Sequence, residues 1–184
     1  MMDYRYYLKE VLISEEQLQQ RIVEIGAQIS KDYSNSDSLL LICILRGGVL
    51  FLTDLMRHIT IPHAIDFMAV SSYGMGGRES QGAVRIKMDL MTDIRDRDVL
   101  IVEDIVDSGH TLSSVMQLLS TRKPASLNIC TLLDKEERRE VEVPIRYRGF
   151  AIPNKFVFGY GLDLDELFRN LPFVGVVDLE KYDA

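Results

Sequence analysis

Residues 99–112 read VLIVEDIVDSGHTL, and this stretch combines an aliphatic strand with three acids. It opens with four aliphatic residues, as a buried strand does. Glu103 and Asp104 then stand side by side, and Asp107 leads into a Ser-Gly turn. Charges next to a core strand are unfavourable unless something pairs with them. The stretch therefore predicts a polar ligand at the end of a buried strand.

Comparable aliphatic strands alternate with amphipathic helices along the rest of the chain. We expect the longer strands at residues 38–45, 63–73, 83–90, 98–105 and 126–133, with short late strands at 155–161 and 173–179. We expect helices at residues 14–33, 46–59 and 111–120, the first of them marked by the capping-box pair Ser14 and Gln17. This alternation predicts an α/β fold with a mostly parallel central sheet flanked by helices. Such sheets bind ligands beyond the carboxyl ends of their strands.

Two segments are expected to lie outside the central sheet. The loop GMGGRESQG, residues 74–82, holds four glycines and predicts a flexible β-hairpin lid. The N-terminal helix and the segment after Lys135 are expected to form a small hood over the site. The length of 184 residues suits one domain over 1–184, with this hood formed by terminal segments.

Composition excludes several classes of protein. The net charge of -7 argues against a broad basic surface for nucleic acid. Cys43 and Cys130 lie in aliphatic runs and read as buried thiols of a reducing cytoplasm, and three scattered histidines make a zinc site improbable. The opening MMDYRYYLKE lacks the apolar run of a signal peptide, and no run is long enough to span a membrane. We therefore expect a cytoplasmic protein without nucleic-acid or membrane partners.

The segment DSGHT, residues 107–111, is called the cradle loop below because its residue types suit a phosphate. It lies between a strand and a helix, where small residues let backbone N–H groups and the positive helix end approach an anion. The nucleoside-triphosphate motif and the dinucleotide G-x-G-x-x-G motif are both absent. The carboxylates of Glu103 and Asp104 suit vicinal sugar hydroxyls. Taken singly, a solvated strand end and a plain helix entry explain these features; together they indicate a ribose 5-phosphate.

The whole stretch resembles the phosphoribosyl-pyrophosphate signature of the type I phosphoribosyltransferases. The segments LRGG (45–48), LLDK (132–135) and KFVFGYGLDLDELFRNL (155–171) resemble the 6-oxopurine branch, the hypoxanthine and hypoxanthine-guanine phosphoribosyltransferases. This likeness runs over most of the chain, from about residue 39 to residue 177. It implies the type I phosphoribosyltransferase fold, with a small hood and a hairpin lid.

The resemblance implies an enzyme of purine salvage. The 5-phosphoribosyl group would pass from phosphoribosyl pyrophosphate to N9 of hypoxanthine or guanine, giving IMP or GMP and pyrophosphate. Glu103 and Asp104 match the acids that hold the ribose hydroxyls, and Asp107 matches the general base near purine N7. Capping of the following helix is the alternative role of Asp107. The 5′-phosphate is expected on Asp107, Ser108, Gly109, His110 and Thr111.

The other segments match further contacts of the family. LRGG resembles the pyrophosphate loop, whose cis peptide would join Leu45 and Arg46. The expected pyrophosphate contacts are Arg46, Gly47 and Arg169. The expected purine contacts are Lys135 on the 6-oxo group, Phe156 stacking on the ring, and the backbone of Val157. Taken alone, Lys135 would be a solvated loop residue and Phe156 a core residue.

The lid and the metal follow from the same resemblance. Ser72 and Tyr73 match the Ser-Tyr pair that covers the reacting centre and keeps water out. Mg²⁺ is the expected cofactor, because pyrophosphate leaves readily only when its charge is neutralised. Its expected contacts are Asp163, Glu103 and Asp104, although a lone Asp163 reads equally as a surface acid. By resemblance we also expect a homo-oligomer, either a dimer or a tetramer.

Two other functions remain open at this point. A different type I enzyme would act on xanthine, adenine or a pyrimidine, but LLDK and KFVFGYGLD favour the 6-oxopurine branch. A regulatory relative that keeps the signature would bind RNA instead, which a net charge of -7 supports poorly.

Overall fold

The computed structural model describes residues 3–72 and 84–182. Six strands form the main sheet in the order β4-β3-β2-β5-β6-β7. Their bounds are β2 (Leu40–Leu45), β3 (Ala64–Ser72), β4 (Val84–Met88), β5 (Asp98–Val106), β6 (Ser126–Asp134) and β7 (Ile145–Ala151). All neighbours pair in parallel except β3 and β4, which are antiparallel. The predicted mostly parallel sheet is confirmed, whereas the predicted lid loop lies outside the described residues.

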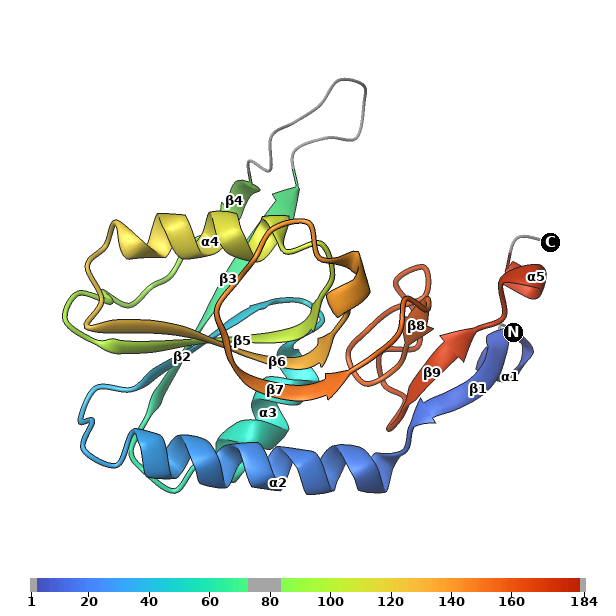
Figure 1. The fold of residues 1–184 in the computed structure, drawn as a ribbon, viewed down its shortest axis with the longest axis horizontal. Coiled ribbons are helices and arrows are strands. Elements are labelled where there is room, and N and C mark those ends of the chain that lie inside the picture. The colour runs from blue at the N-terminus through green and yellow to red at the C-terminus, as the bar shows by residue number, and fades with distance from the viewer. Residues whose placement is uncertain (1–2, 73–83, 183–184) are drawn as a thin grey trace.

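Helices cover both faces of the main sheet (Figure 1). Helices α2 (Glu15–Asp32) and α3 (Val49–Arg57) pack on one face, where Leu41 and Cys43 of β2 point. Helix α4 (His110–Ser120) packs on the other face, against Leu40 and Ile42. Burial from both sides explains why the central strands are almost continuously aliphatic rather than alternating.

Helix α2 begins as the sequence predicts but packs elsewhere than expected. The hydroxyl of Ser14 accepts from the backbone of Gln17, and the Gln17 side chain accepts in return from the backbone of Ser14. The buried residues of α2 are Leu18, Ile22, Ile25, Gly26 and Ile29. This face contacts the core beside α3, so the expectation that the N-terminal helix belongs to the hood is wrong. Helical periodicity identifies an apolar face but not the surface that this face covers.

The hood is a second, three-stranded sheet in the order β1-β9-β8. It contains β1 (Leu8–Ile13), β8 (Val157–Phe158) and β9 (Val174–Val177), with the short helices α1 (Tyr4–Tyr7) and α5 (Leu179–Tyr182). Figure 1 shows the hood beyond the carboxyl ends of β5, β6 and β7, with both ends of the chain beside it. Terminal segments therefore do build the hood, and it faces the edge where ligands of parallel sheets bind.

The segment after Lys135 divides between the two sheets. It first forms a single 3-10 turn, η1 (Glu136–Arg138), and then returns to the main sheet as β7. Strand β7 pairs in parallel with β6 and places Ile145 beside Ile129. This strand was not predicted, and the expectation that the whole segment belongs to the hood is wrong. Strand β7 is an edge strand in which exposed arginines alternate with apolar residues, which is the pattern of a half-buried strand.

The two cysteines lie in the core at the same level of β2 and β6, each opposite Val102 of the intervening strand β5. Both thiols are free and fully buried. Burial, with smaller contributions from the charges of Glu103 and Asp104, raises the pKa of Cys43 to about 12. Among the described helices, none is both long and apolar enough to cross a bilayer.

A buried carboxylate fixes the loop that joins β4 to β5. Asp66 on β3 is only 7% exposed. Its Oδ1 accepts from the N–H of Phe67, and its Oδ2 accepts from the N–H groups of Met91 (3.0 Å) and Thr92 (2.8 Å). Burial alone would raise the pKa of Asp66, but these hydrogen bonds outweigh burial and lower it.

This network predicts a pH-dependent loss of stability in Asp66→Asn. The amide would present an NH₂ group to N–H donors, so we expect the free energy of unfolding at pH 7 to fall by about 1–3 kcal/mol. The folded pKa lies below the unfolded value, so the contribution of Asp66 is present above the unfolded pKa and is lost as pH falls through the folded pKa. Urea unfolding at pH 7 and pH 3 measures it. The exposed loop variant Asp93→Asn is the control, and an equal Asp66→Asn deficit at both pH values would contradict the assignment.

Candidate active site

The register of β5 and β6 brings a carboxylate and a cation together at the carboxyl edge of the sheet. Val106 pairs with Asp134, so the next residues, Asp107 and Lys135, leave the sheet side by side. The Nζ atom of Lys135 lies 3.6 Å from Oδ2 of Asp107. Lys135 is only 7% exposed, and its N–H donates to the carbonyl of Val106 at 2.9 Å. A buried ammonium here offers a fixed hydrogen-bond donor next to a carboxylate.

The cradle loop turns from β5 into α4 and surrounds a small cavity of about 140 Å³. Gly109 is the N-cap of α4, with φ at 91°, and a Cβ there would also collide with the carbonyl of Val141. Among the described residues no side chain caps the helix, so the alternative role of Asp107 as an N-cap is not observed. The first N–H groups of such a helix end can bind an anion.

The side chain of His110 is engaged outside the cradle. Its Nε2 lies 2.9 Å from Oε2 of Glu140. His110 is the first residue of α4 and does not line the cradle cavity. Ser108, Gly109 and Thr111 line the cavity themselves.

Glu103 and Asp104 lie where two cavities meet. Glu103 lines the cradle cavity and also a larger cavity of about 520 Å³, called the acid-lined cavity below. Burial and the charge of Asp104 raise the pKa of Glu103 well above its usual range. Burial likewise raises the pKa of Asp104 to about 6, against the opposing N–H of Ile105 and the charge of Arg169. A cation bound next to these two acids would stabilise their charged forms.

The far side of the acid-lined cavity is formed by the predicted pyrophosphate residues. The peptide bond between Leu45 and Arg46 is cis, as predicted. Arg46 Nη2 lies 2.5 Å from Oε2 of Glu166, and Arg169 Nη2 lies 2.8 Å from Oδ1 of Asp163. The structure thus brings together Arg46, Gly47, Glu103, Asp104, Asp163 and Arg169 around one cavity.

The donor set of this cavity fits a hard divalent cation. Oε2 of Glu103 is buried and has no hydrogen-bond partner among the described residues. Asp104 and Asp163 line the same cavity. Over residues 3–72 and 84–182, no group of three or more His, Cys, Asp or Glu side chains is arranged to hold a metal ion. An open set of a few carboxylates is what Mg²⁺ uses when water and phosphate complete its shell.

The predicted purine-stacking residue lies in a different cavity. Phe156 is 42% exposed and lines a cavity of about 330 Å³ in the hood, together with Val176 and Leu179. Its ring centroid is 5.7 Å from that of Tyr182. Val157 is buried on β8 and pairs with Val176. The hood thus exposes an aromatic ring, but the described contacts do not join it to Lys135.

The lid residues are only partly described. Ser72 is the last residue of β3, and Tyr73 lies outside the described residues. Their covering role stays a prediction.

Two residues at the site were missed by the sequence analysis. Lys87 on β4 lines the acid-lined cavity, at the irregularity where Ala69 pairs with Met88 but Val70 pairs with Ile86. Arg138 at the end of η1 donates from Nε to Oδ1 of Asp107 at 3.1 Å. The register of β4 determines the position of Lys87, and the 3-10 turn η1 determines that of Arg138. Neither feature corresponds to a motif in the sequence.

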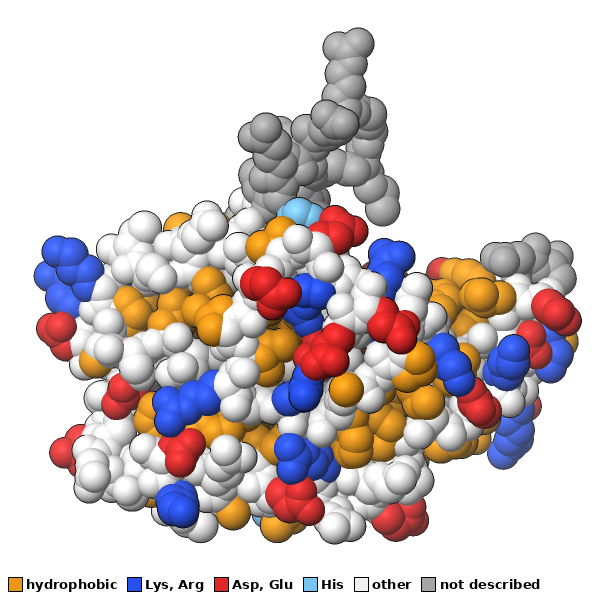
Figure 2. Space-filling view, viewed as in Figure 1, with side chains coloured by type: hydrophobic (Ala, Val, Ile, Leu, Met, Phe, Trp, Pro, Cys, Tyr) orange, Lys and Arg blue, Asp and Glu red, His pale blue; other side chains and the backbone are white. Residues whose placement is uncertain are grey.

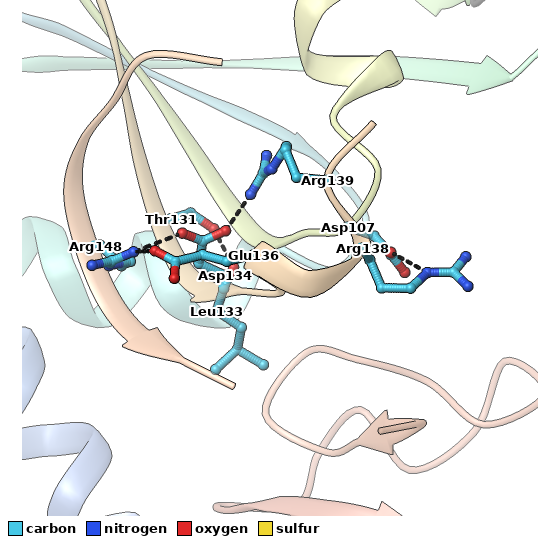
Figure 3. Close-up of polar contacts among 8 residues, drawn as sticks. All are labelled: Asp107, Thr131, Leu133, Asp134, Glu136, Arg138, Arg139 and Arg148. Carbon is cyan, nitrogen blue, oxygen red and sulfur yellow. Dashed lines mark hydrogen bonds and ion pairs between the residues drawn. The ribbon is translucent and has the colours of Figure 1, made fainter. Parts of the chain in front are cut away.

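A buried ion cluster supports the end of β6 (Figure 3). Asp134 is 2% exposed, and its two carboxylate oxygens are engaged by Arg139 and Arg148. Arg148 also pairs with Glu136. The residue directly before Lys135 is therefore fixed from two sides. Figure 2 shows this face as interspersed basic and acidic side chains.

The carboxyl edge of the parallel sheet thus gathers the cradle loop, the vicinal acids Glu103 and Asp104, and the basic residues of the acid-lined cavity. Residues 13–165 match the model of the phosphoribosyl transferase domain. The chain belongs to the phosphoribosyl transferase family.

Individual relatives narrow the comparison. The chain is 52% identical over 171 residues to the hypoxanthine phosphoribosyltransferase of Salmonella typhimurium, covering 92% of this chain and 96% of the relative. It is also 52% identical over 180 residues to the hypoxanthine-guanine phosphoribosyltransferase of Mycobacterium avium, covering 95% and 88%. A crystal structure of a Staphylococcus aureus hypoxanthine phosphoribosyltransferase superposes with a TM-score of 0.92 at 48% identity, covering 97% of this chain and 96% of that one.

The close approach of Gly47 to Asp104 generates a prediction. A methyl group on Gly47 would overlap the Asp104 carboxylate, so Gly47→Ala should displace that acid. We expect phosphoribosyl transfer to fall by roughly 10–100-fold, the scale of effect that a misplacement of about 1 Å produces. Gly48→Ala is the matched control, because a Cβ at Gly48 meets its nearest atoms at 3.1 Å and none belongs to a site acid. Equal activity of the two variants would contradict this account.

Proposed function

We propose that the chain transfers the 5-phosphoribosyl group from phosphoribosyl pyrophosphate to N9 of a 6-oxopurine, giving IMP or GMP and pyrophosphate. The observation that carries the proposal is the pairing of Lys135 Nζ with Asp107 Oδ2 at 3.6 Å, directly beside the cradle cavity. A 6-oxopurine carries its 6-oxo group and N7 on one edge, so it needs a donor and a base next to each other. The relatives named for hypoxanthine or hypoxanthine-guanine transfer support the same substrate class.

The two cavities divide phosphoribosyl pyrophosphate between them. The 5′-phosphate would bind the N–H groups and hydroxyls of the cradle loop. Glu103 and Asp104 would accept hydrogen bonds from the ribose hydroxyls, which fits the position of Glu103 in both cavities. Arg46, Gly47 and Arg169 would hold the pyrophosphate, for which a guanidinium fork is well suited.

The proposed reaction replaces a carbon–oxygen bond at the anomeric carbon with a carbon–nitrogen bond and transfers one proton. Purine N9 attacks the anomeric carbon, and the electron pair of the broken carbon–oxygen bond leaves with pyrophosphate. The purine proton moves from N7 to a carboxylate oxygen of Asp107. Phe156 would stack on the base and Val157 would contact its edge through the backbone. Ser72 and Tyr73 would cover the centre against water.

Magnesium is the proposed cofactor, held by Asp163 with Glu103 and Asp104. When bound, it would neutralise the charge of the pyrophosphate leaving group. The buried, unpartnered Oε2 of Glu103 and the raised pKa values of Glu103 and Asp104 support this assignment.

Three coarser features complete the proposal. The free buried thiols suit a reducing cytoplasm. One domain over 1–184 and a homo-oligomer stay proposals. Interspersed charges on the face shown in Figure 2, with the net charge of -7, favour the enzyme over an RNA-binding relative.

Pyrophosphate release tests the function and the role of Lys135 together. Phosphoribosyl pyrophosphate and Mg²⁺ are supplied with hypoxanthine, guanine, xanthine, adenine or uracil in turn. Lys135 is a donor only, so the 6-amino group of adenine would meet donor with donor. We expect a preference for an oxopurine over adenine of about 10⁴–10⁵-fold.

Lys135→Ala should slow oxopurines more than adenine, while Lys181→Ala, which removes an exposed lysine, should not. Efficient use of adenine or uracil by the unmodified protein would overturn the proposal, and an RNA gel shift without turnover would favour the regulatory alternative.

Replacement of the proposed base gives a separate prediction. Asp107→Asn should lower kcat by about 10²–10⁴-fold, because the amide cannot accept the purine proton. The cradle loop remains intact, so IMP should still bind, which calorimetry measures. A near-normal kcat in this variant would remove Asp107 from the chemistry.

A further inference from the structure

The carboxylate of Asp107 is contacted by a different cation on each oxygen. Nε of Arg138 donates to Oδ1 at 3.1 Å (Figure 3), and Nζ of Lys135 lies 3.6 Å from Oδ2. The side chains of Asp107 and Arg138 are 44% and 49% exposed, so both can be reached by ligand. Nothing in the proposed function so far uses Arg138.

The backbone segment that carries Arg138 is anchored next to Asp107. Exposed pairs contribute little when both side chains are free to move. Here the N–H of Lys135 donates to the carbonyl of Val106, and the N–H groups of Glu140 and Val141 both donate to the carbonyl of Ser108. Residues 135–141 are thus joined to the chain on both sides of Asp107.

A second anchor sets the direction in which Arg138 points. The next residue, Arg139, turns the opposite way and pairs with the buried Asp134, with only 9% of its side chain exposed. Figure 3 shows Arg139 and Arg148 converging on Asp134 while Arg138 reaches Asp107. Because Asp134 holds Arg139, the 3-10 turn η1 directs Arg138 towards Asp107.

The two oxygens of Asp107 are consequently not equivalent. Oδ1 is occupied by Arg138, whereas Oδ2 faces the ammonium of Lys135. We infer that Arg138 is a positioning residue: by holding Oδ1, it keeps Oδ2 turned towards the purine edge, where it takes the N7 proton. This inference rests on the proposed function, in which Lys135 binds the 6-oxo group beside N7.

Steady-state kinetics of Arg138→Met test the inference. We expect kcat with hypoxanthine to fall by roughly 5–30-fold, since the base remains but its orientation is lost. The KM for phosphoribosyl pyrophosphate should stay within about 2-fold, because no ground-state contact to it is removed. Arg138→Lys keeps a cationic donor, so its kcat should lie between those of Arg138→Met and the unmodified protein. If the Met variant folds poorly, Arg138→Lys still tests the inference. Arg122→Met is the matched control, because it also removes an arginine from an aspartate, Asp89 at 2.8 Å.

A double variant separates positioning from a general structural effect. In the Asp107→Asn background, Arg138→Met should cause no further loss of kcat, because residues that act through one another are not additive. A loss of equal size in both backgrounds would overturn the inference. An unchanged or increased kcat in Arg138→Met alone would also overturn it. A raised KM for phosphoribosyl pyrophosphate at constant kcat would do the same.

The same data distinguish a failure of the proposed function from a failure of the role of Arg138. If the unmodified protein releases no pyrophosphate with oxopurines, or if Asp107→Asn keeps its kcat, the proposed function or its base is wrong and the inference falls with it. If the unmodified protein is active and Asp107→Asn is impaired while Arg138→Met is not, only the role of Arg138 is wrong.

Discussion

The parallel pairing of β5 with β6 is the constraint on which the site depends. Glu103 lies opposite Thr131, and Val106 lies opposite Asp134, so the acids and the cradle loop leave one strand beside Lys135 on the next. A slip of one residue would turn every side chain of β5 to the opposite face of the sheet and would separate Asp107 from Lys135. The packing of β5 on both faces therefore fixes the chemistry at its end. The ion cluster around Asp134 adds a second restraint on β6 at the same level.

Much of the fold could be predicted because its central strands are aliphatic and its glycines mark the turns. The capping box of Ser14 and the cis bond before Arg46 were likewise predictable, one from local chemistry and the other from resemblance. The partner of α2 could not be predicted, since periodicity gives a face without its destination. Strand β7 was missed although IRYRGFA alternates apolar residues with arginines, which is the pattern of a half-buried edge strand.

The site shows the same division between local and spatial information. The cradle loop and the acid pair are contiguous in sequence, so their residue types alone indicate the ligand chemistry. Lys87 and Arg138 approach the site through a strand irregularity and a 3-10 turn, and no pattern in the sequence records either. Phe156 was assigned by resemblance, and the hood places its ring beside Tyr182, in a cavity separate from the two described for the ribose phosphate.

The two buried thiols have a consequence for how the core can be observed. A thiolate is the species that reacts with alkylating agents, and burial in the aliphatic core keeps both Cys43 and Cys130 protonated. Labelling of either thiol therefore requires the sheet to open first. Cys43 reports on β2 and Cys130 on β6, on the two strands that flank β5. The native chain thus carries its own pair of probes for local unfolding on both sides of the strand that bears the acids.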